Sequence, residues 1–149
     1  DGQVVAQALR ALANLLWNVE NQNRCNAHIP QLVLLCRHPH PGASEGAFAS
    51  LANAMFYHAP NRAAFAAETG SVEAVVEGVR HAEDAVAASA ARCAGTAAYD
   101  DGLSRALGAA GAVEALVALL GRAGTSDACT RYAAFALGQL FALSRNKSR

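Results

Sequence analysis

The segment ALRALANLL at residues 8–16 returns in altered form three times along the chain, and this recurrence decides the fold. The later copies are GAFASLANAM at residues 46–55, AARCAGTAA at residues 90–98 and YAAFALGQLF at residues 132–141. Aligned on Asn14, Asn53, Gly95 and Gln139, successive copies are separated by 39, 42 and 44 residues. A period in this range is typical of a stacked helical repeat, in which each unit buries its apolar face against its neighbours.

A second apolar helix recurs with the same period. It reads IPQLVLLCR at residues 29–37, SVEAVVEGVR at residues 71–80 and AVEALVALLGR at residues 112–122. Its markers Ile29 and Val72 are 43 residues apart, and Val72 and Val113 are 41 apart. Polar turns follow these helices, most clearly HPHPG at residues 38–42, where two prolines prevent a helix from continuing. Two independent markers therefore predict an all-α solenoid.

The positions of the helix start and stop signals predict one domain over residues 1–143. We expect a leading helix at residues 1–18, a break in the polar stretch 19–23, and three repeats at residues 19–58, 60–99 and 100–143. Asp84 and Asp127 are expected to cap long helices, and Gly70 to close a short helix in a left-handed conformation. Residues 144–149 read as a flexible basic tail, more typical of a solubilising end than of a nucleic-acid contact.

The composition fits a packed binding domain better than a nucleic-acid or membrane protein. The 149 residues are 53% hydrophobic, and twelve basic and twelve acidic side chains cancel, without the strongly basic surface typical of nucleic-acid binding. No apolar run is long enough for a membrane span. Nine acids and five bases lie within residues 38–122, which favours a partner with basic residues. Four cysteines without paired short spacing indicate reduced thiols and an intracellular, cytoplasmic location.

The order of short helix, glycine, apolar helix, polar turn and long helix resembles the armadillo repeat, with HEAT repeats as the nearest alternative. The resemblance covers nearly the whole chain. It is carried by IPQLV at residues 29–33, GSVEAVV at 70–76, GAVEALV at 111–117, ALANL at 11–15 and ALGQL at 136–140. It implies a right-handed superhelix whose third helices line a concave groove for extended peptides.

The resemblance also implies where a peptide would bind. In importin-α members the third helix carries a Trp and, four residues later, an Asn that bonds the ligand backbone. Here the Asn position holds Asn14, Asn53, Gly95 and Gln139, and the Trp position holds Arg10, Ala49, Ala91 and Phe135. No repeat keeps both residues, which argues against a receptor for nuclear localisation signals. The predicted partner-binding residues, with Leu143 as a further groove position, are Arg10, Asn14, Asn18, Asn53, Tyr57, Tyr99, Phe135 and Gln139.

These candidates also have purely structural interpretations. An Asn near a helix end can satisfy backbone groups of the adjoining turn, as Asn14 and Asn53 would. Tyr57 and Tyr99 can pack their rings against the next repeat and leave their hydroxyls in water. Trp17 is predicted to lie in the core.

A zinc site is the chemical alternative that the sequence offers. Its ligands would come from a cluster of thiols and imidazoles: Cys25, His28, Cys36, His38, His40 and His58. The cluster contains no CxxC pair, and solvated turn histidines are the simpler interpretation. The acidic pairs at residues 83–84 and 100–101 suit helix caps, and no phosphate-binding loop or nucleophile motif is present. We therefore expect no enzymatic activity and no cofactor.

The predicted function is a non-catalytic module or scaffold that binds an extended peptide or a partner helix along its concave face. The alternative is a self-associating or capping fragment of a longer repeat assembly. It rests on the leading helix, which lacks the two helices that precede it in a full unit and so leaves apolar surface uncovered.

Overall fold

The computed structural model describes residues 1–146, and of residues 143–146 it describes the backbone alone. Helix α1 (Gly2–Leu15) is followed by three sets of helices. The first contains α2 (Val19–Cys25), the 3-10 turn η1 (Asn26–His28), α3 (Ile29–Leu35) and α4 (Pro41–Met55). The second contains α5 (Ala59–Ala67), α6 (Ser71–Val79) and α7 (Asp84–Ala97), and the third α8 (Asp101–Ala109), α9 (Ala112–Gly121) and α10 (Asp127–Asn146). The described residues form the predicted all-α solenoid.

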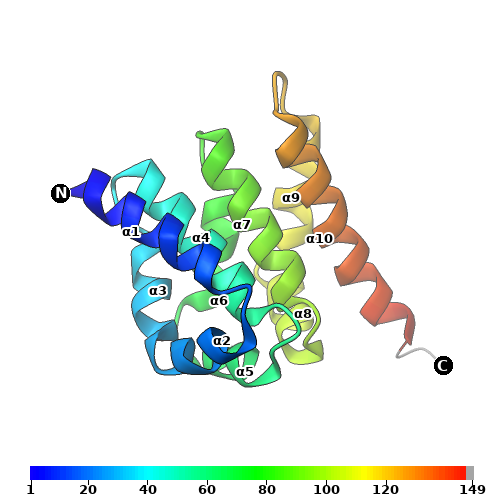
Figure 1. Ribbon diagram of the computed structural model, residues 1–149. Helices are drawn as coiled ribbons and strands as arrows, with labels where there is room; N and C mark the ends of the chain where they lie inside the picture. Colours follow the sequence, from blue (N-terminus) through cyan, green and yellow to red (C-terminus); the bar gives the residue numbers. More distant parts are fainter. Residues whose placement is uncertain (147–149) are drawn as a thin grey trace.

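The long helices stand side by side in chain order. Figure 1 shows α1, α4, α7 and α10 in one row, with α3, α6 and α9 behind them and the short helices α2, α5 and α8 at one end. Each long helix packs against the next, and α6 and α9 pack against each other in the second row. Contacts therefore run mainly between neighbouring repeats, as expected of a solenoid.

Small residues let these helices approach closely. A Cβ added at Gly78 of α6 would lie 2.4 Å from Cζ of the buried Phe48, and one at Gly46 of α4 would lie 2.8 Å from Cβ of Leu9. The Ser50 hydroxyl, also fully buried, donates a hydrogen bond to the Leu9 carbonyl at 3.1 Å. The rest of the core consists mainly of Ala, Leu and Val, as the composition suggests.

A buried polar network fixes the turn that joins α4 to α5. Gln22 Nε2 donates to the Asn53 carbonyl at 2.8 Å, and Asn61 Nδ2 donates to the carbonyls of Gln22 and Ala54 at 2.9 and 2.7 Å. The His58 ring accepts from the Asn61 backbone N–H through Nδ1, and its Nε2 lies 2.7 Å from Asn23 Oδ1. The network ties the first repeat to the second at the foot of α4.

Several predicted helix ends differ from the observed ones. The leading helix stops at Leu15, and the polar stretch expected to break the chain is helix α2, because Asn18 Oδ1 accepts from the backbone N–H groups of Glu20 and Asn21. Helix α10 continues to Asn146, beyond the expected start of a tail at residue 144; the remaining tail residues, 147–149, lie outside the described residues. Gly70 is left-handed with φ +79°, as predicted.

Two further expectations bear on the class of protein. Within residues 1–146, no single helix is long and apolar enough to cross a membrane. Helices α8 and α9, bent by 69° at their junction, are together long and apolar enough for a span, judged by length and composition alone. All four cysteines are free and buried.

Candidate functional site

The first of two adjoining hollows opens on the row of long helices. It has a volume of about 410 Å³, and all four long helices or the turns that follow them contribute to it. Its walls are mainly aromatic and its charged groups are cationic. The lining residues are Trp17, Ala52, Phe56, Arg92, Thr96, Arg131, Tyr132 and Phe135.

The second hollow continues from the first toward the start of α1. It has a volume of about 270 Å³ and shares Trp17 and Arg92 with the first, so that these two side chains form the boundary between them. Its other lining residues are Arg10, Ala13, Asn14, Glu45, Gly46, Ala49 and Asn53. We refer to the two hollows together as the groove.

Arg92 is the central residue of the groove. Its guanidinium carbon lies 5.7 Å from the ring centroid of Trp17 and 5.9 Å from that of Tyr132. A guanidinium between two aromatic faces gains cation–π attraction from both. Its Nη2 also donates to Asn53 Oδ1. Sequence reasoning missed Arg92, although its place inside the repeated segment at residues 90–98 was visible.

Trp17 is a groove residue, and the prediction that it lies in the core is wrong. Its side chain is 61% exposed, and its ring meets Phe56 edge-on at a centroid distance of 6.0 Å. The reason is local: α1 ends at Leu15, and in the turn that follows it Leu16 is buried while Trp17 is exposed. An exposed Trp held by a neighbouring ring is a common anchor for a partner.

Asn53 links helices of the fold and also lines the groove. It is only 3% exposed, and its Nδ2 donates to the Ala13 carbonyl at 2.7 Å while its Oδ1 accepts from Arg92. These bonds link α1, α4 and α7, and they occupy the groups expected to meet a ligand backbone. Asn14, by contrast, is exposed and lines the second hollow. The expected ladder of side-chain amides therefore has Asn14 as its accessible member.

Gly95, where the ladder of amides breaks, has a packing explanation. A Cβ there would lie 2.4 Å from Cε1 of Phe135, so glycine lets the Phe135 ring rest against α7. Phe135 lines the first hollow. Gln139, one helical turn later on α10, is half-buried but is not among the residues that line the two hollows. The side chain of Leu143 lies outside the described residues.

The other predicted binding residues lie beside the groove. Asn18 caps α2 through its side-chain oxygen. Tyr57, 74% exposed, contacts Phe56 at a centroid distance of 4.3 Å and Tyr99 at 5.6 Å. Burial, followed by hydrogen bonding to Tyr57, raises the pKa of the Tyr99 phenol. The rings of Trp17, Phe56, Tyr57 and Tyr99 thus form a connected aromatic row that extends from the groove along the ends of α4 and α7.

The charge that faces the groove is positive, although the acid count of the middle segment favours a partner with basic residues. Arg92 and Arg131 line the first hollow, and among the described residues lining it there is no carboxylate. In the second hollow Glu45 pairs with Arg10 at 3.8 Å. Two other acids of the middle segment have structural roles: Glu77 pairs with Arg37 at 2.9 Å, and Asp100 caps α8. Sequence counting found the acids but could not tell which face they occupy.

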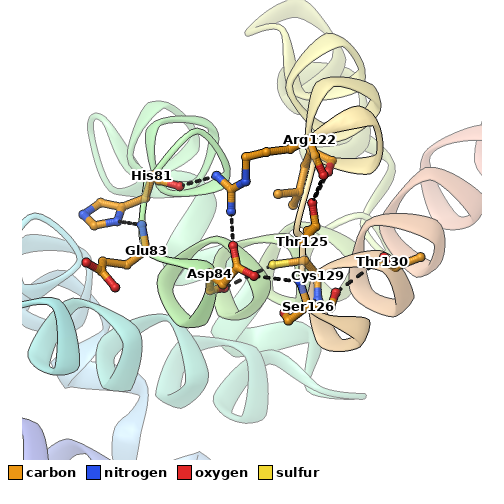
Figure 2. Close-up of polar contacts among 9 residues, drawn as sticks. His81, Glu83, Asp84, Arg122, Thr125, Ser126, Cys129 and Thr130 are labelled. Carbon is orange, nitrogen blue, oxygen red and sulfur yellow. Dashed lines mark hydrogen bonds and ion pairs between the residues drawn. The ribbon is translucent and has the colours of Figure 1, made fainter.

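A separate polar cluster joins the turn before α7 to the turn before α10 (Figure 2). The Asp84 carboxylate accepts from Arg122 Nη2 and from the Ser126 backbone N–H, the latter at 2.7 Å. The hydrogen bond from the Ser126 N–H, the largest effect, lowers the pKa of Asp84; desolvation opposes it, and the Arg122 guanidinium lowers the pKa further. Arg122 Nη1 also donates to the His81 carbonyl at 2.8 Å. These three contacts each join the second repeat to the third, so the cluster is a structural clamp.

The proposed zinc ligands do not come together. In residues 1–146 no group of three or more His, Cys, Asp or Glu side chains is placed to hold a metal. His58 is engaged by Asn23 and Asn61, and His38 Nδ1 accepts from the His40 backbone N–H at 3.0 Å. Burial raises the pKa of the Cys25 and Cys36 thiols, which disfavours the thiolate form that zinc requires.

Comparison with known proteins identifies the fold. No protein-family model matches the sequence, and no curated protein matches it. Among solved structures, an engineered protein is similar over 94% of this chain, with 26% identity and a TM-score of 0.86. A computationally designed armadillo repeat protein for modular peptide recognition matches over 93% with 22% identity and a TM-score of 0.79. A designed armadillo repeat protein in complex with the peptide (KR)4 matches over 94% with 21% identity and a TM-score of 0.77.

These structures are longer than the present chain. It covers 57% of the engineered protein and 59% of each of the two designed armadillo repeat proteins. The likeness establishes an armadillo-like repeat fold for the described residues.

Proposed function

We propose that this chain is a non-catalytic protein-interaction module that binds an extended peptide in the groove. The observation that carries the proposal is the arrangement of Trp17 after α1, Arg92 on α7 and Tyr132 on α10, in which the Arg92 guanidinium contacts both rings at a hollow of about 410 Å³. Aromatic and arginine side chains dominate the binding energy of protein interfaces. Two of the similar folds are designed for or complexed with peptides, which supports the same use here.

An extended peptide fits this surface better than a compact ligand. The groove crosses four parallel helices, and its two hollows adjoin end to end. The exposed amide of Asn14 can donate to and accept from a peptide backbone, while the aromatic walls accept side chains. Four buried free thiols fit a reducing compartment, and a cytoplasmic location is part of the proposal.

Selection from a random-peptide display library tests the proposal. The purified chain should enrich peptides, and a synthetic copy of the most enriched one should bind with an affinity measurable by fluorescence anisotropy. Trp17→Ala should weaken that binding by about tenfold or more, since exposed aromatic anchors contribute this much at interfaces. Leu34→Ala is the matched control, because Leu34 is 75% exposed on α3 and is not among the residues lining the groove.

Two results would refute peptide binding in the groove. One is a selection in which no peptide is enriched over a support without protein. The other is an enriched peptide whose affinity is the same for the wild type and for Trp17→Ala.

Self-association is a second candidate, favoured by apolar side chains on the outermost helices. Val4 and Leu15 of α1 are 63% and 59% exposed, and Val117 and Leu120 of α9 are 55% and 41% exposed. In a solenoid these helices would be covered by further repeats or by a second copy. Sedimentation equilibrium tests this: a mass that rises with concentration, and that Leu15→Ser with Val117→Ser returns to the monomer value, supports it, and a monomer at all concentrations refutes it.

A further inference from the structure

The first hollow combines aromatic walls with unneutralised positive charge. Four of its lining residues carry rings: Trp17, Phe56, Tyr132 and Phe135. Arg92 and Arg131 supply two cations, and no described lining residue supplies an anion. A site with this lining fits a ligand that brings both an apolar group and a negative charge.

Arg92 is held in place before any ligand arrives. The rings of Trp17 and Tyr132 lie 5.7 and 5.9 Å from its guanidinium carbon, and Asn53 accepts one of its N–H bonds. A guanidinium has five N–H donors, so most are left for a ligand when a single hydrogen bond is made within residues 1–146. A planar guanidinium fixed by stacking is well prepared to bind a carboxylate through two parallel hydrogen bonds.

Arg131 adds a second, more accessible cation. It is exposed at the start of α10, and its guanidinium carbon lies 5.6 Å from the ring centroid of Tyr132. Tyr132 therefore contacts both arginines of the hollow. The other arginine of the groove, Arg10, is already paired with Glu45 in the second hollow. The net attraction for an anion is thus greatest in the first hollow.

We propose that the groove selects acidic peptides, in which an Asp or Glu side chain binds Arg92 and Arg131 and a nearby aromatic or large aliphatic side chain packs against Trp17 and Phe56. This rests on the proposed function, and it specifies the partner. A peptide fits better than a nucleic acid because the chain has no net charge and the hollow offers two cations, whereas nucleic-acid binding depends on many phosphate contacts.

The composition of the peptides selected in the display experiment is the first test. Enriched sequences should contain Asp or Glu beside Phe, Tyr, Trp or Leu. For the most enriched synthetic peptide, Glu→Gln should weaken binding by about tenfold, because the loss of a hydrogen bond between charged groups reduces affinity by about this factor. Added salt should weaken it further, since the arginines are partly solvated.

Substitutions in the protein provide the second test. Arg131→Gln should weaken the acidic peptide by about tenfold without harm to the fold, because the side chain is exposed. Arg92→Gln should do the same, and its thermal unfolding is measured alongside because it also removes a partner of Asn53. Arg105→Gln, at an exposed position on α8 that is not among the lining residues of the groove, should leave binding unchanged. Arg131→Glu should favour the Glu→Lys version of the peptide over the original.

Failure of this inference can be told apart from failure of peptide binding. Peptides that are enriched, lose affinity with Trp17→Ala, and yet are neutral or basic would refute acidic selectivity while leaving the groove as the binding site. Affinity for an acidic peptide that is unchanged in both Arg131→Gln and Arg92→Gln would refute it too. A single-stranded oligouridine that displaces the peptide with equal or higher affinity would reassign the hollow to nucleic acid.

Discussion

Asn53 shows how one side chain can hold three helices of a solenoid together. Its amide nitrogen reaches the Ala13 carbonyl on α1, and its oxygen receives Arg92 from α7. The Ala13 carbonyl lies near the end of α1, where carbonyl groups have no partner within the helix. The same bonds position Arg92 in the groove, so this residue serves stability and the site together.

Replacement of Asn53 should therefore affect stability more than replacement of its repeat equivalent. Asn53→Ala removes both hydrogen bonds of a residue that is 3% exposed, and we expect the free energy of unfolding to fall by about 1–3 kcal/mol. Asn14→Ala, at an exposed position, should change it by less than about 0.5 kcal/mol. Urea unfolding followed by circular dichroism measures both. Equal losses in the two variants would contradict this assignment of roles.

His58 should make stability depend on pH near neutrality. Burial, and then the positive charge of Arg62, lower the pKa of the His58 imidazole below its ordinary 6.5. The folded state needs the neutral ring, because Nδ1 accepts from the Asn61 N–H. The unfolded chain binds the proton more readily, so this contribution is complete above about pH 6.5 and is lost as the pH falls from there through the folded-state pKa.

Thermal unfolding at about pH 7.5 and about pH 5.5 checks the His58 prediction. The wild type should melt at a lower temperature in the acidic buffer, and His58→Gln should show a smaller difference between the two. His28→Gln, which changes an exposed imidazole in η1, should retain the wild-type difference. A wild-type melting temperature that rises on acidification would be opposite in sign to the prediction.

At the scale of the helices, sequence periodicity predicts the elements well and their ends less well. The recurrence of ALRALANLL and IPQLVLLCR fixed the order of long and second helices, because burial of an apolar stripe repeats with the helix period. It did not predict that residues 19–23 are helical. This stretch is polar and was therefore expected to be a break, but the Asn18 side chain caps a helix there. It also placed Trp17 in the core, because the leading helix was expected to continue to residue 18. The helix ends at Leu15, and Trp17 lies exposed in the turn that follows.

The groove was only partly predictable from the repeats. Alignment identified Arg10, Asn14, Asn53 and Phe135, all of which line it. It missed Arg92 and Tyr132, because a comparison with one family pattern examines two positions in each helix and these residues lie at others. The sign of the charge in the groove could not be predicted from the sequence either. Ion pairs such as Arg37 with Glu77 and Arg122 with Asp84 form between residues about one repeat apart, and counting charges along the chain does not reveal them.

Two glycines in helices should respond oppositely to alanine. In α6, a Cβ at Gly78 would meet Cζ of Phe48 at 2.4 Å and Cβ of Ala90 at 2.8 Å, both fully buried. Gly78→Ala should therefore destabilise by about 1–3 kcal/mol, as overpacked cores do. At Gly138 of α10, apart from the helix backbone itself, no atom of the described residues lies within 4 Å of the added atom. Gly138→Ala should stabilise by about 0.5–1 kcal/mol, through helix propensity alone.

Urea unfolding of the two single variants, with the m-value compared to the wild type, checks this pair. A stabilising Gly78→Ala would mean that Phe48 can move aside, and hence that the interface between the first and second repeats is looser than the packing implies. The comparison is internally matched, because both substitutions add the same methyl group inside a helix.

At the scale of the whole molecule, the repeats interact mainly with their neighbours. The long helices contact one another in the order α1, α4, α7 and α10, and the groove spans all of them. Stability in such an array is a sum of terms within repeats and between adjacent ones. A ligand that bridges α1 and α10 would therefore couple parts of the chain that otherwise depend on each other only through the middle repeat.

Substitutions that create a cavity in one repeat should destabilise that repeat more than distant ones. Leu116 of α9 and Ile29 of α3 are both fully buried, in the third and first sets of helices. Leu116→Ala and Ile29→Ala should each cost about 2–5 kcal/mol. In native-state hydrogen exchange, Leu116→Ala should speed exchange in α8, α9 and the described part of α10 more than in α1 and α3, and Ile29→Ala should give the reverse. If both variants accelerate all helices equally, the solenoid opens as one cooperative unit, and neither the additive description nor the bridging role of a groove ligand would hold.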